Sequence, residues 1–388
     1  MPKISHIINK LRRLNDKEKV SLNTIQEYIK DTERIKLIKS LLKERKISIE
    51  YKKLELNITD HIHYPEIKAE TENIDVSDIN SDIRKGAEKK LFKVFSHKAF
   101  EELPKYIATN IKGMEDARKA IALQLFSAQP IHILLLGDPG TGKTDLLRAA
   151  SELSPIASFG LGSGTSGAGL VVTVRGNEII KGILPKADKG LCCIDELNLM
   201  KEDSRAGLYN AMEKGFVTYD KGGHHYKFDA RIKVLATANP RGDRFRGKTI
   251  SELKKEMPFD PALLTRFHLI FLVRKPDFRR FREIADKIVS GEKKKVNEAD
   301  KEFIKDYVEY TNKIEKVEFP KEMHKEIVDF VAQIKKYETK YLIEVSPRLV
   351  IGIMRLCKAL AKMELREKVE KKDISRIKDI VKNSLKIE

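Results

Sequence analysis

The segment Gly137-Asp138-Pro139-Gly140-Thr141-Gly142-Lys143-Thr144 guides the interpretation of the whole chain. It follows an apolar run over residues 131–136 and precedes a helix-like pattern that starts at Asp145. Glycines let such a loop curl until its N–H groups point inward at phosphate oxygens, and the amino end of the next helix adds partial positive charge. This order of strand, loop and helix predicts a nucleotide phosphate loop.

Within that loop, Lys143 is expected to reach the β and γ phosphates of ATP, and the Thr144 hydroxyl is expected to ligate Mg²⁺. The residues predicted to bind ATP are Gly137, Asp138, Pro139, Gly140, Thr141, Gly142, Lys143, Thr144 and Asp145.

The composition is that of an ordinary globular protein. The chain has 388 residues, of which 41% are hydrophobic, and it contains only three cysteines. It has no apolar run of about 18 residues and no apolar signal segment at its start. We therefore expect a cytoplasmic, nucleoid-associated protein with no membrane partner, without disulfides or a zinc ribbon, and its Lys, Glu and Ile content favours an archaeal source.

Lysine and arginine number 76 against 58 acidic residues, which gives a formal charge of +18. Polyanions such as nucleic acid are the natural partners of such a chain, although a lysine-rich solvated surface gives the same composition.

Charge also divides the chain. Residues 1–58 hold 15 basic and 8 acidic residues, whereas residues 59–82 hold one lysine and seven acids. We predict a small basic, mostly helical module over 1–58, with helices at 4–14 and 35–42 and a strand at 47–51, and an acidic linker over 59–84. The module is compatible with a winged-helix-like nucleic-acid binder or with an oligomerisation appendage.

Apolar runs alternate with amphipathic helical patterns over residues 85–275, which predicts an α/β domain with a parallel sheet covered by helices. Residues 276–388 are nearly all helical in pattern and predict a helical lid. Its four expected helices cover 304–314, 324–334, 347–363 and 374–385.

Two further strands end in polar residues. Leu191–Ile194 delivers Asp195 and Glu196 to the edge of the sheet where ligands of open α/β sheets bind. Asp195 is placed to hold Mg²⁺, and Glu196 to deprotonate the water that attacks the γ phosphate. The strand 232–238 delivers Asn239, which could polarise that water, although an ordinary Asn-Pro turn is the alternative. Arg266, set among apolar residues before the run 269–273, is expected to meet an anion.

These residues together resemble the ATPase core of the minichromosome maintenance (MCM) family of replicative helicases, a branch of the AAA+ P-loop ATPases. The resemblance runs from about Ala108 to Met363. It is carried by the segments 190–196, 209–213, Asn239-Pro240 and 263–271, in addition to the phosphate loop.

The resemblance implies roles for individual residues. Lys143 and Thr144 match the Walker A pair, Asp195 and Glu196 the Walker B pair, and Asn239 matches sensor 1. Arg266 matches the arginine finger that completes a neighbouring subunit's site, and Arg348 matches the sensor 2 arginine. Because the arginine finger is supplied by a neighbouring subunit, the resemblance also implies a ring, which we expect to be a homohexamer.

Two segments match insertions that the family uses on DNA. Residues 217–227 also predict a hairpin with a Gly-Gly bend from their sequence pattern alone. Within them, Lys221 falls where the family places its DNA-contacting lysine. Residues 169–179 resemble a second channel hairpin, in which Arg175 is a candidate DNA contact.

The chain also departs from the family pattern. Gly142-Lys143-Thr144 stands where members usually carry Ala-Lys-Ser. A short dissimilar stretch that ends near Arg84 stands where they carry an OB-fold and a zinc ribbon, and no cysteine precedes Cys192.

Three functions therefore remain open at this stage. The first is an ATP-dependent helicase or translocase of MCM type that pulls single-stranded or forked DNA through a ring channel. The second is a MoxR-like AAA+ ATPase that remodels proteins. The third is a nucleotide-binding regulator that joins full-length MCM without unwinding DNA.

Overall fold

A computed structural model describes residues 16–386, except for residues 55, 57, 59–61, 72–73, 110, 112, 176–177, 222–223, 243, 276–277, 279–281, 283–284, 287–288, 290–295 and 343. The chain divides into two compact units, Met1–His97 and Lys98–Glu388. The predicted helix at 4–14 lies outside the described residues.

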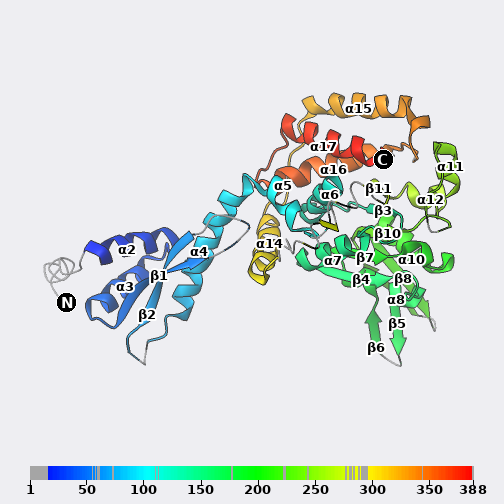
Figure 1. Cartoon of the computed structure of the whole chain (residues 1–388). Helices are drawn as coiled ribbons and strands as arrows, with labels where there is room; N and C mark the ends of the chain where they lie inside the picture. The colour runs from blue at the N-terminus through cyan, green and yellow to red at the C-terminus, as the bar shows by residue number, and fades with distance from the viewer. Residues whose placement is uncertain are drawn as a thin grey trace. The chain divides into compact units, whose positions relative to one another are not determined.

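The first unit consists of α2 (Asp16–Tyr28), α3 (Thr32–Lys43), β1 (Ile47–Leu54), β2 (Ile62–Ala69) and α4 (Ser77–Ser96). The strands form an antiparallel hairpin in which Ile47 pairs with Ala69 and Leu54 with Ile62. Figure 1 shows the three helices beside the hairpin, and buried apolar residues of all these elements share one core. The predicted helix at 35–42 and strand at 47–51 are confirmed.

The prediction of an acidic linker over 59–84 is wrong in its described part, because β2 and the first turns of α4 occupy it. The Asn80 side chain holds α4 against β2 by accepting from Ile67 N–H at 2.8 Å and donating to Ile67 O at 2.7 Å. The acids of this stretch face basic residues of the same unit: Glu66 pairs with Lys52 at 2.5 Å, and Asp82 pairs with Arg34. At least two acids of the predicted linker therefore belong to a folded unit and pair with its basic residues.

The second unit contains a parallel sheet, as the sequence predicts, and this sheet has five strands, of which β4 is not among those predicted. Its strands lie in the order β11-β3-β10-β7-β4. Their bounds are β3 (Ile133–Gly137), β4 (Ala157–Leu161), β7 (Leu191–Asp195), β10 (Lys233–Ala238) and β11 (Leu269–Val273). Every residue of β3, β7 and β10 is buried, as expected for strands covered on both faces.

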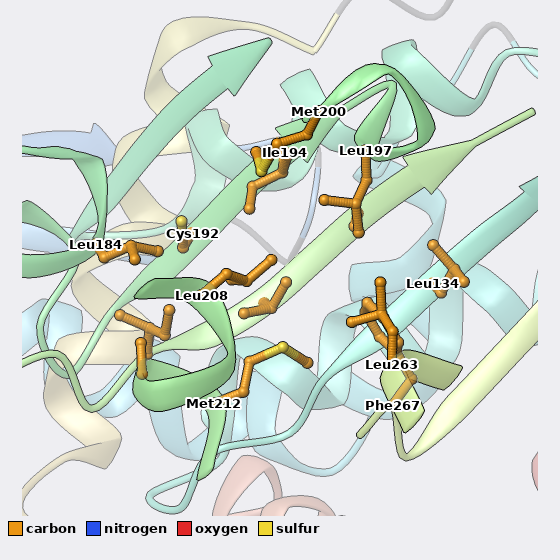
Figure 2. Packing of buried hydrophobic residues seen from close by; sticks show 14 of the residues in the cluster. Leu134, Leu184, Cys192, Ile194, Leu197, Met200, Leu208, Met212, Leu263 and Phe267 are labelled. Atoms are coloured by element: carbon orange, nitrogen blue, oxygen red, sulfur yellow. The ribbon is translucent and has the colours of Figure 1, made fainter. Parts of the chain in front are cut away.

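Helices cover this sheet on both sides (Figure 1). The helices of this part of the chain include α5 (Ala99–Glu102), α6 (Glu115–Phe126), α7 (Lys143–Leu153), α10 (Arg205–Lys214), α11 (Ile250–Lys255) and α12 (Pro261–Leu264). One apolar core joins the sheet to α10 and α12, and Figure 2 shows Leu134, Ile194, Leu208 and Leu263 within it. Neighbours on β7 face opposite sides, because Cys192 belongs to this core while the Cys193 thiol lies 3.6 Å from Leu147 O of α7.

Two antiparallel hairpins project from the sheet's connections. One consists of β5 (Val172–Arg175) and β6 (Glu178–Lys181), which follow α8 (Gly167–Leu170) and precede α9 (Ile183–Lys186). The other consists of β8 (Phe216–Lys221) and β9 (His224–Asp229), with Lys221 paired to His224. Both hairpins predicted from the sequence are therefore present, although the bends at 176–177 and 222–223 lie outside the described residues.

The remaining helices form the lid: α14 (Glu298–Thr311), α15 (His324–Lys336), α16 (Pro347–Met363) and α17 (Lys371–Ser384). Ion pairs stabilise its interior, where Arg366 lies 2.7 Å from Asp373 and 2.9 Å from Glu364. All four helices predicted from periodicity are confirmed, and α16 has the predicted bounds.

Candidate active site

The phosphate loop joins β3 to α7, and its backbone has the conformation that its glycines allow. Gly140 and Gly142 have φ angles of 73° and 85°. A Cβ added to Gly142 would lie 2.2 Å from the Ile111 side chain, so a larger residue could not be accommodated there without movement. The Asp138 carboxylate fixes the loop from outside by accepting from Phe245 N–H at 2.9 Å and Lys275 N–H at 3.1 Å.

Lys143 lies inside this loop and is only 6% exposed. Its ammonium donates to Gly137 O at 2.9 Å and Asp138 O at 2.6 Å. Burial lowers the pKa of Lys143 to about 8, although the carboxylates of Asp138, Asp195 and Glu196 oppose the shift. The loop thus surrounds a buried cation that an anionic ligand would stabilise in its charged form.

Asp195 ends β7 beside the first turn of α7. Its two carboxylate oxygens accept from Thr144 Oγ1 at 3.1 and 3.0 Å, and Asp195 Oδ1 also accepts from Thr237 Oγ1 at 2.5 Å. A carboxylate next to a hydroxyl is a set of hard oxygen donors, which is what Mg²⁺ prefers. Thr144 and Asp195 therefore fit the magnesium role that the sequence predicts.

Glu196 comes next and has an unusual backbone. Its φ is 52°, in the left-handed region that non-glycine residues seldom adopt. Its N–H donates to Thr237 Oγ1 at 2.8 Å. Behind it, a Cβ added to Gly162 would lie 2.1 Å from Glu196 O. Thr237 and Gly162 therefore hold this backbone conformation in place from two sides.

Asn239 lies at the same edge, directly after β10. Its N–H donates to the side-chain oxygen of Asn198 at 2.9 Å. Because β10 lies between β3 and β7 in the sheet, Asn239 stands between the phosphate loop and the Asp195-Glu196 pair.

Arg266 and Arg348 lie on the opposite side of the sheet, where the amino ends of the strands lie. We call this side the amino edge, and the side with the phosphate loop, where the strands end, the carboxyl edge. Arg266 precedes β11, and the register pairs Leu269 with Ile133 at the amino ends of the strands and Val273 with Gly137 at their carboxyl ends. Strands of five residues are about 13–16 Å long. Arg266 is therefore separated from the phosphate loop of its own chain by the length of the sheet.

Arg348 of the lid joins Arg266 there. Its Nη1 donates to Thr265 O at 3.3 Å. The Glu213 carboxylate at the end of α10 contacts both guanidinium groups, Arg266 at 3.1 Å and Arg348 at 3.6 Å. Arg266 also stacks over the Tyr209 ring at 4.8 Å. Two cations from separate elements thus share one half-exposed carboxylate.

Buried neutral histidines fix the end of α10 that carries Glu213. His132 Nδ1 accepts from Val234 N–H at 3.2 Å, which leaves Nε2 to donate to Met212 O at 3.2 Å. Burial lowers the pKa of His132 to about 3, so the ring stays neutral at physiological pH. Glu213 follows Met212 directly.

Comparison with known proteins matches two family models to the chain, from the second half of α4 to α17. The MCM P-loop domain matches residues 87–292, and the MCM AAA-lid domain matches residues 302–385. The chain belongs to the MCM family.

Similar curated MCM relatives come from different kingdoms. The chain is 33% identical to "DNA replication licensing factor MCM4" of Arabidopsis thaliana over 304 residues, which cover 71% of this chain and 36% of that protein. It is 32% identical to "Minichromosome maintenance protein MCM" of Saccharolobus solfataricus over 301 residues, which cover 71% of this chain and 43% of that protein.

A third relative, "DNA replication licensing factor mcm7-B" of Xenopus laevis, is 29% identical over 328 residues, which cover 77% of this chain and 45% of that protein. The chain thus spans less than half the length of these relatives. Because plant, archaeal and frog proteins all match, the similarity does not single out an archaeal source. Among the described residues, no helix is long and apolar enough to cross a bilayer.

The geometry sorts the residues predicted from the sequence of this MCM chain. Lys143, Thr144, Asp195, Glu196 and Asn239 meet at the carboxyl edge of the sheet. Arg266 and Arg348 meet at the amino edge. Asp145 is exposed in the first turn of α7, where no contact assigns it a role. Lys221 ends β8 and Arg175 ends β5, but their side chains lie outside what the structure describes.

Sequence reasoning missed three residues of this arrangement. Thr237 links Asp195 to Glu196, and its only signal is a hydroxyl in an otherwise apolar run. Asn198 orients the Asn239 backbone, and Glu213 joins the two arginines. Glu213 lies in a segment that carried the family resemblance, but no spacing rule connects it to Arg266, 53 residues away.

The lowered pKa of Lys143 predicts how stability depends on pH. The folded pKa is about 8 and the ordinary value is 10.5, so between these values the unfolded chain binds more protons than the folded one. The free energy of unfolding of the wild type should therefore rise, relative to that of Lys143→Met, as pH increases from about 8 to 10.5. Urea unfolding of both proteins across this range measures the difference. Buried Lys233, whose pKa is lowered to about 7, is present in both and cancels. A constant difference across the range would contradict the burial of a charged Lys143.

Proposed function

We propose that this chain is the ATP-hydrolysing subunit of an MCM-type ring that moves along DNA. The observation that carries the proposal is the separation of the catalytic residues between the two edges of one sheet. The residues suited to binding ATP lie at the carboxyl edge, whereas the two arginines suited to stabilising γ-phosphate charge lie at the amino edge. One chain alone cannot bring them together.

The carboxyl edge supplies what a bound triphosphate requires. Lys143 and the loop N–H groups neutralise the phosphates, and Thr144 and Asp195 would hold the metal. A Mg²⁺ ion bound there would offset negative charge on the phosphates. Glu196, held by Thr237, orients and deprotonates the attacking water, and Asn239 helps to position it. The Lys143, Thr144 and Asp195 side chains and the backbones of Glu196 and Asn239 are all held by neighbours without a ligand, and preorganised groups favour electrostatic catalysis.

The amino edge completes a neighbour's site. Arg266 and Arg348 form a paired cationic group held by Glu213, and a γ phosphate would offer them more negative charge than one carboxylate does. Arginine fingers supplied by a neighbour raise turnover by about 10³–10⁵-fold in other phosphate-transferring proteins. Because each chain presents one edge of each kind, the contact is head-to-tail and closes into a ring, for which we propose six subunits.

The hairpins are the proposed contacts with DNA. The β8–β9 hairpin stands on a fixed base, where Arg231 donates to both oxygens of Asp188 at 3.0 and 2.6 Å. At the other end of its paired strands lies Lys221. A lysine beside a hairpin bend suits a phosphate contact, which is independent of base sequence, and Arg175 of the β5–β6 hairpin has the same position.

A mixing experiment tests the shared site. Arg266→Ala retains a complete phosphate loop and Lys143→Ala retains both arginines, so each should be inactive alone. In co-assembled equal mixtures, about one interface in four combines an intact loop with an intact finger, and about a quarter of wild-type ATPase activity should return.

The matched control mixes Arg266→Ala with the double variant Lys143→Ala/Arg266→Ala, which offers no complete interface. Equal recovery in this control would contradict the proposal, as would wild-type turnover by Arg266→Ala alone.

A second test concerns DNA. Lys221→Ala should retain DNA-free ATPase activity but lose most of its stimulation by single-stranded or forked DNA. Lys227→Ala is the control, because the Lys227 ammonium lies over the Phe216 ring, 4.1 Å from its centroid, in the same hairpin. ATPase activity that ignores DNA in the wild type would favour a protein-remodelling ATPase, and no ATPase activity at all would favour a regulator of full-length MCM.

A further inference from the structure

The first unit contains two helices joined by a tight turn. Only residues 29–31 separate α2 from α3. The Asp31 side chain caps α3 by accepting from Glu33 N–H at 2.9 Å and Arg34 N–H at 3.2 Å. Two helices joined by a turn of three or four residues form the helix-turn-helix motif, whose second helix enters the DNA major groove in many proteins.

A β-hairpin follows this pair directly. Residues 44–46 lead from α3 into β1, and Arg45 takes a left-handed φ of 53° at the bend. Ile38 and Leu42 of α3 share a core with Ile47 and Ile67 of the hairpin. The hairpin therefore packs against the second helix as a wing (Figure 1).

Charge is concentrated on the second helix. The sequence of α3, TERIKLIKSLLK, has four basic residues and one acid, whereas that of α2, DKEKVSLNTIQEY, has two basic residues and three acids. The phosphate backbone of DNA would therefore attract α3 but not α2.

The basic residues of α3 lie along one side. Ile35, Ile38 and Leu42 are buried at spacings of three and four residues. Lys36, Lys39 and Lys43 repeat the same spacing one position later, about 100° further around the helix. We call these three lysines the α3 stripe. Leu37, which is 52% exposed, lies beyond them on the solvent side.

Acidic residues elsewhere in the unit pair with other cations. Glu66 pairs with Lys52, Asp82 with Arg34, and Glu50 with Lys68 at 3.4 Å. Within the α3 stripe, Lys36 pairs with the exposed Glu33 at 2.6 Å. Exposed pairs of this kind contribute little and exchange readily for a phosphate.

We propose that the first unit is a winged helix-turn-helix module that binds duplex DNA through α3. The helix lies in the major groove, whose width of about 12 Å admits an α-helix, and the α3 stripe contacts the phosphates along one wall. Leu37 faces the base edges, where an apolar side chain can contact thymine methyl groups. The hairpin contacts the backbone beside the groove. This site is independent of the ATPase cycle, since it involves neither the phosphate loop nor the arginines.

The test measures binding of the full chain to a 20-base-pair duplex by fluorescence anisotropy, without nucleotide, over a series of salt concentrations. In the variant Lys36→Gln/Lys39→Gln/Lys43→Gln, the affinity should fall about tenfold or more. The negative slope of log association constant against log salt concentration should become shallower by about 2–3. The matched control is Lys85→Gln/Lys89→Gln/Lys93→Gln, three exposed lysines along α4 with the same loss of charge. It should change affinity by less than about threefold.

Further variants distinguish binding through α3 from an effect of net charge and from a loss of folding. Lys36→Arg/Lys39→Arg/Lys43→Arg keeps the cations and should bind within about threefold of the wild type. Lys143→Ala should bind the duplex with the affinity of the wild type, because the assay contains no nucleotide. The result therefore does not depend on whether the proposed ATPase function is correct. Equal losses in the α3 and α4 variants would overturn the proposal, because net charge alone would then explain binding. Unchanged binding in the α3 variant would also overturn it, and would leave this face to a protein partner.

Discussion

The parallel sheet of the second unit determines how this protein can act. Its strands all run the same way, so the residues after each strand gather at one edge and the residues before each strand gather at the other. The phosphate loop, Asp195, Glu196 and Asn239 all lie at the carboxyl ends of strands. Arg266 precedes a strand, and Arg348 is held beside it. The two groups are therefore separated by the length of the strands within one chain, and the proposed function joins them between neighbouring subunits.

At each edge, side chains without a proposed catalytic role contact residues to which the proposal gives one. Thr237 donates to Asp195 and accepts from Glu196 N–H, so a single hydroxyl sets the relative position of the proposed metal ligand and the proposed base. Glu213 does the same for Arg266 and Arg348, and its contact with Arg348 links the lid to the α/β domain. Because Arg348 belongs to the lid, a movement of α16 would change the arginine pair that the neighbour receives.

Local patterns predict most of this fold, whereas contacts between distant residues had to come from the structure. Glycine spacing identifies the phosphate loop, apolar runs identify four of the five strands, and helical periodicity gives α16 its bounds; β4, with the sequence ASFGL, carries no such run. The grouping of Arg266 with Arg348 could not be predicted, because it depends on strand register and on Glu213. The prediction of a linker after residue 59 fails, because β2 and α4 occupy that stretch, and two of its acids, Glu66 and Asp82, pair with basic residues of β1 and α3. An acidic stretch has the same composition whether its carboxylates are solvated in a linker or paired with basic residues of a folded unit, so composition alone could not distinguish the two.

The central claim is that each ATP site is built by two chains. A structure of the ring assembled with Mg²⁺ and a nonhydrolysable ATP analogue, determined by electron cryomicroscopy, tests it most directly. The account predicts that the γ phosphate bound by Lys143 of one subunit is contacted at about 3 Å by the Arg266 guanidinium of the next subunit, with Arg348 beside it. A nucleotide contacted by Arg266 of its own chain, or a protein that remains monomeric with the analogue bound, would contradict it.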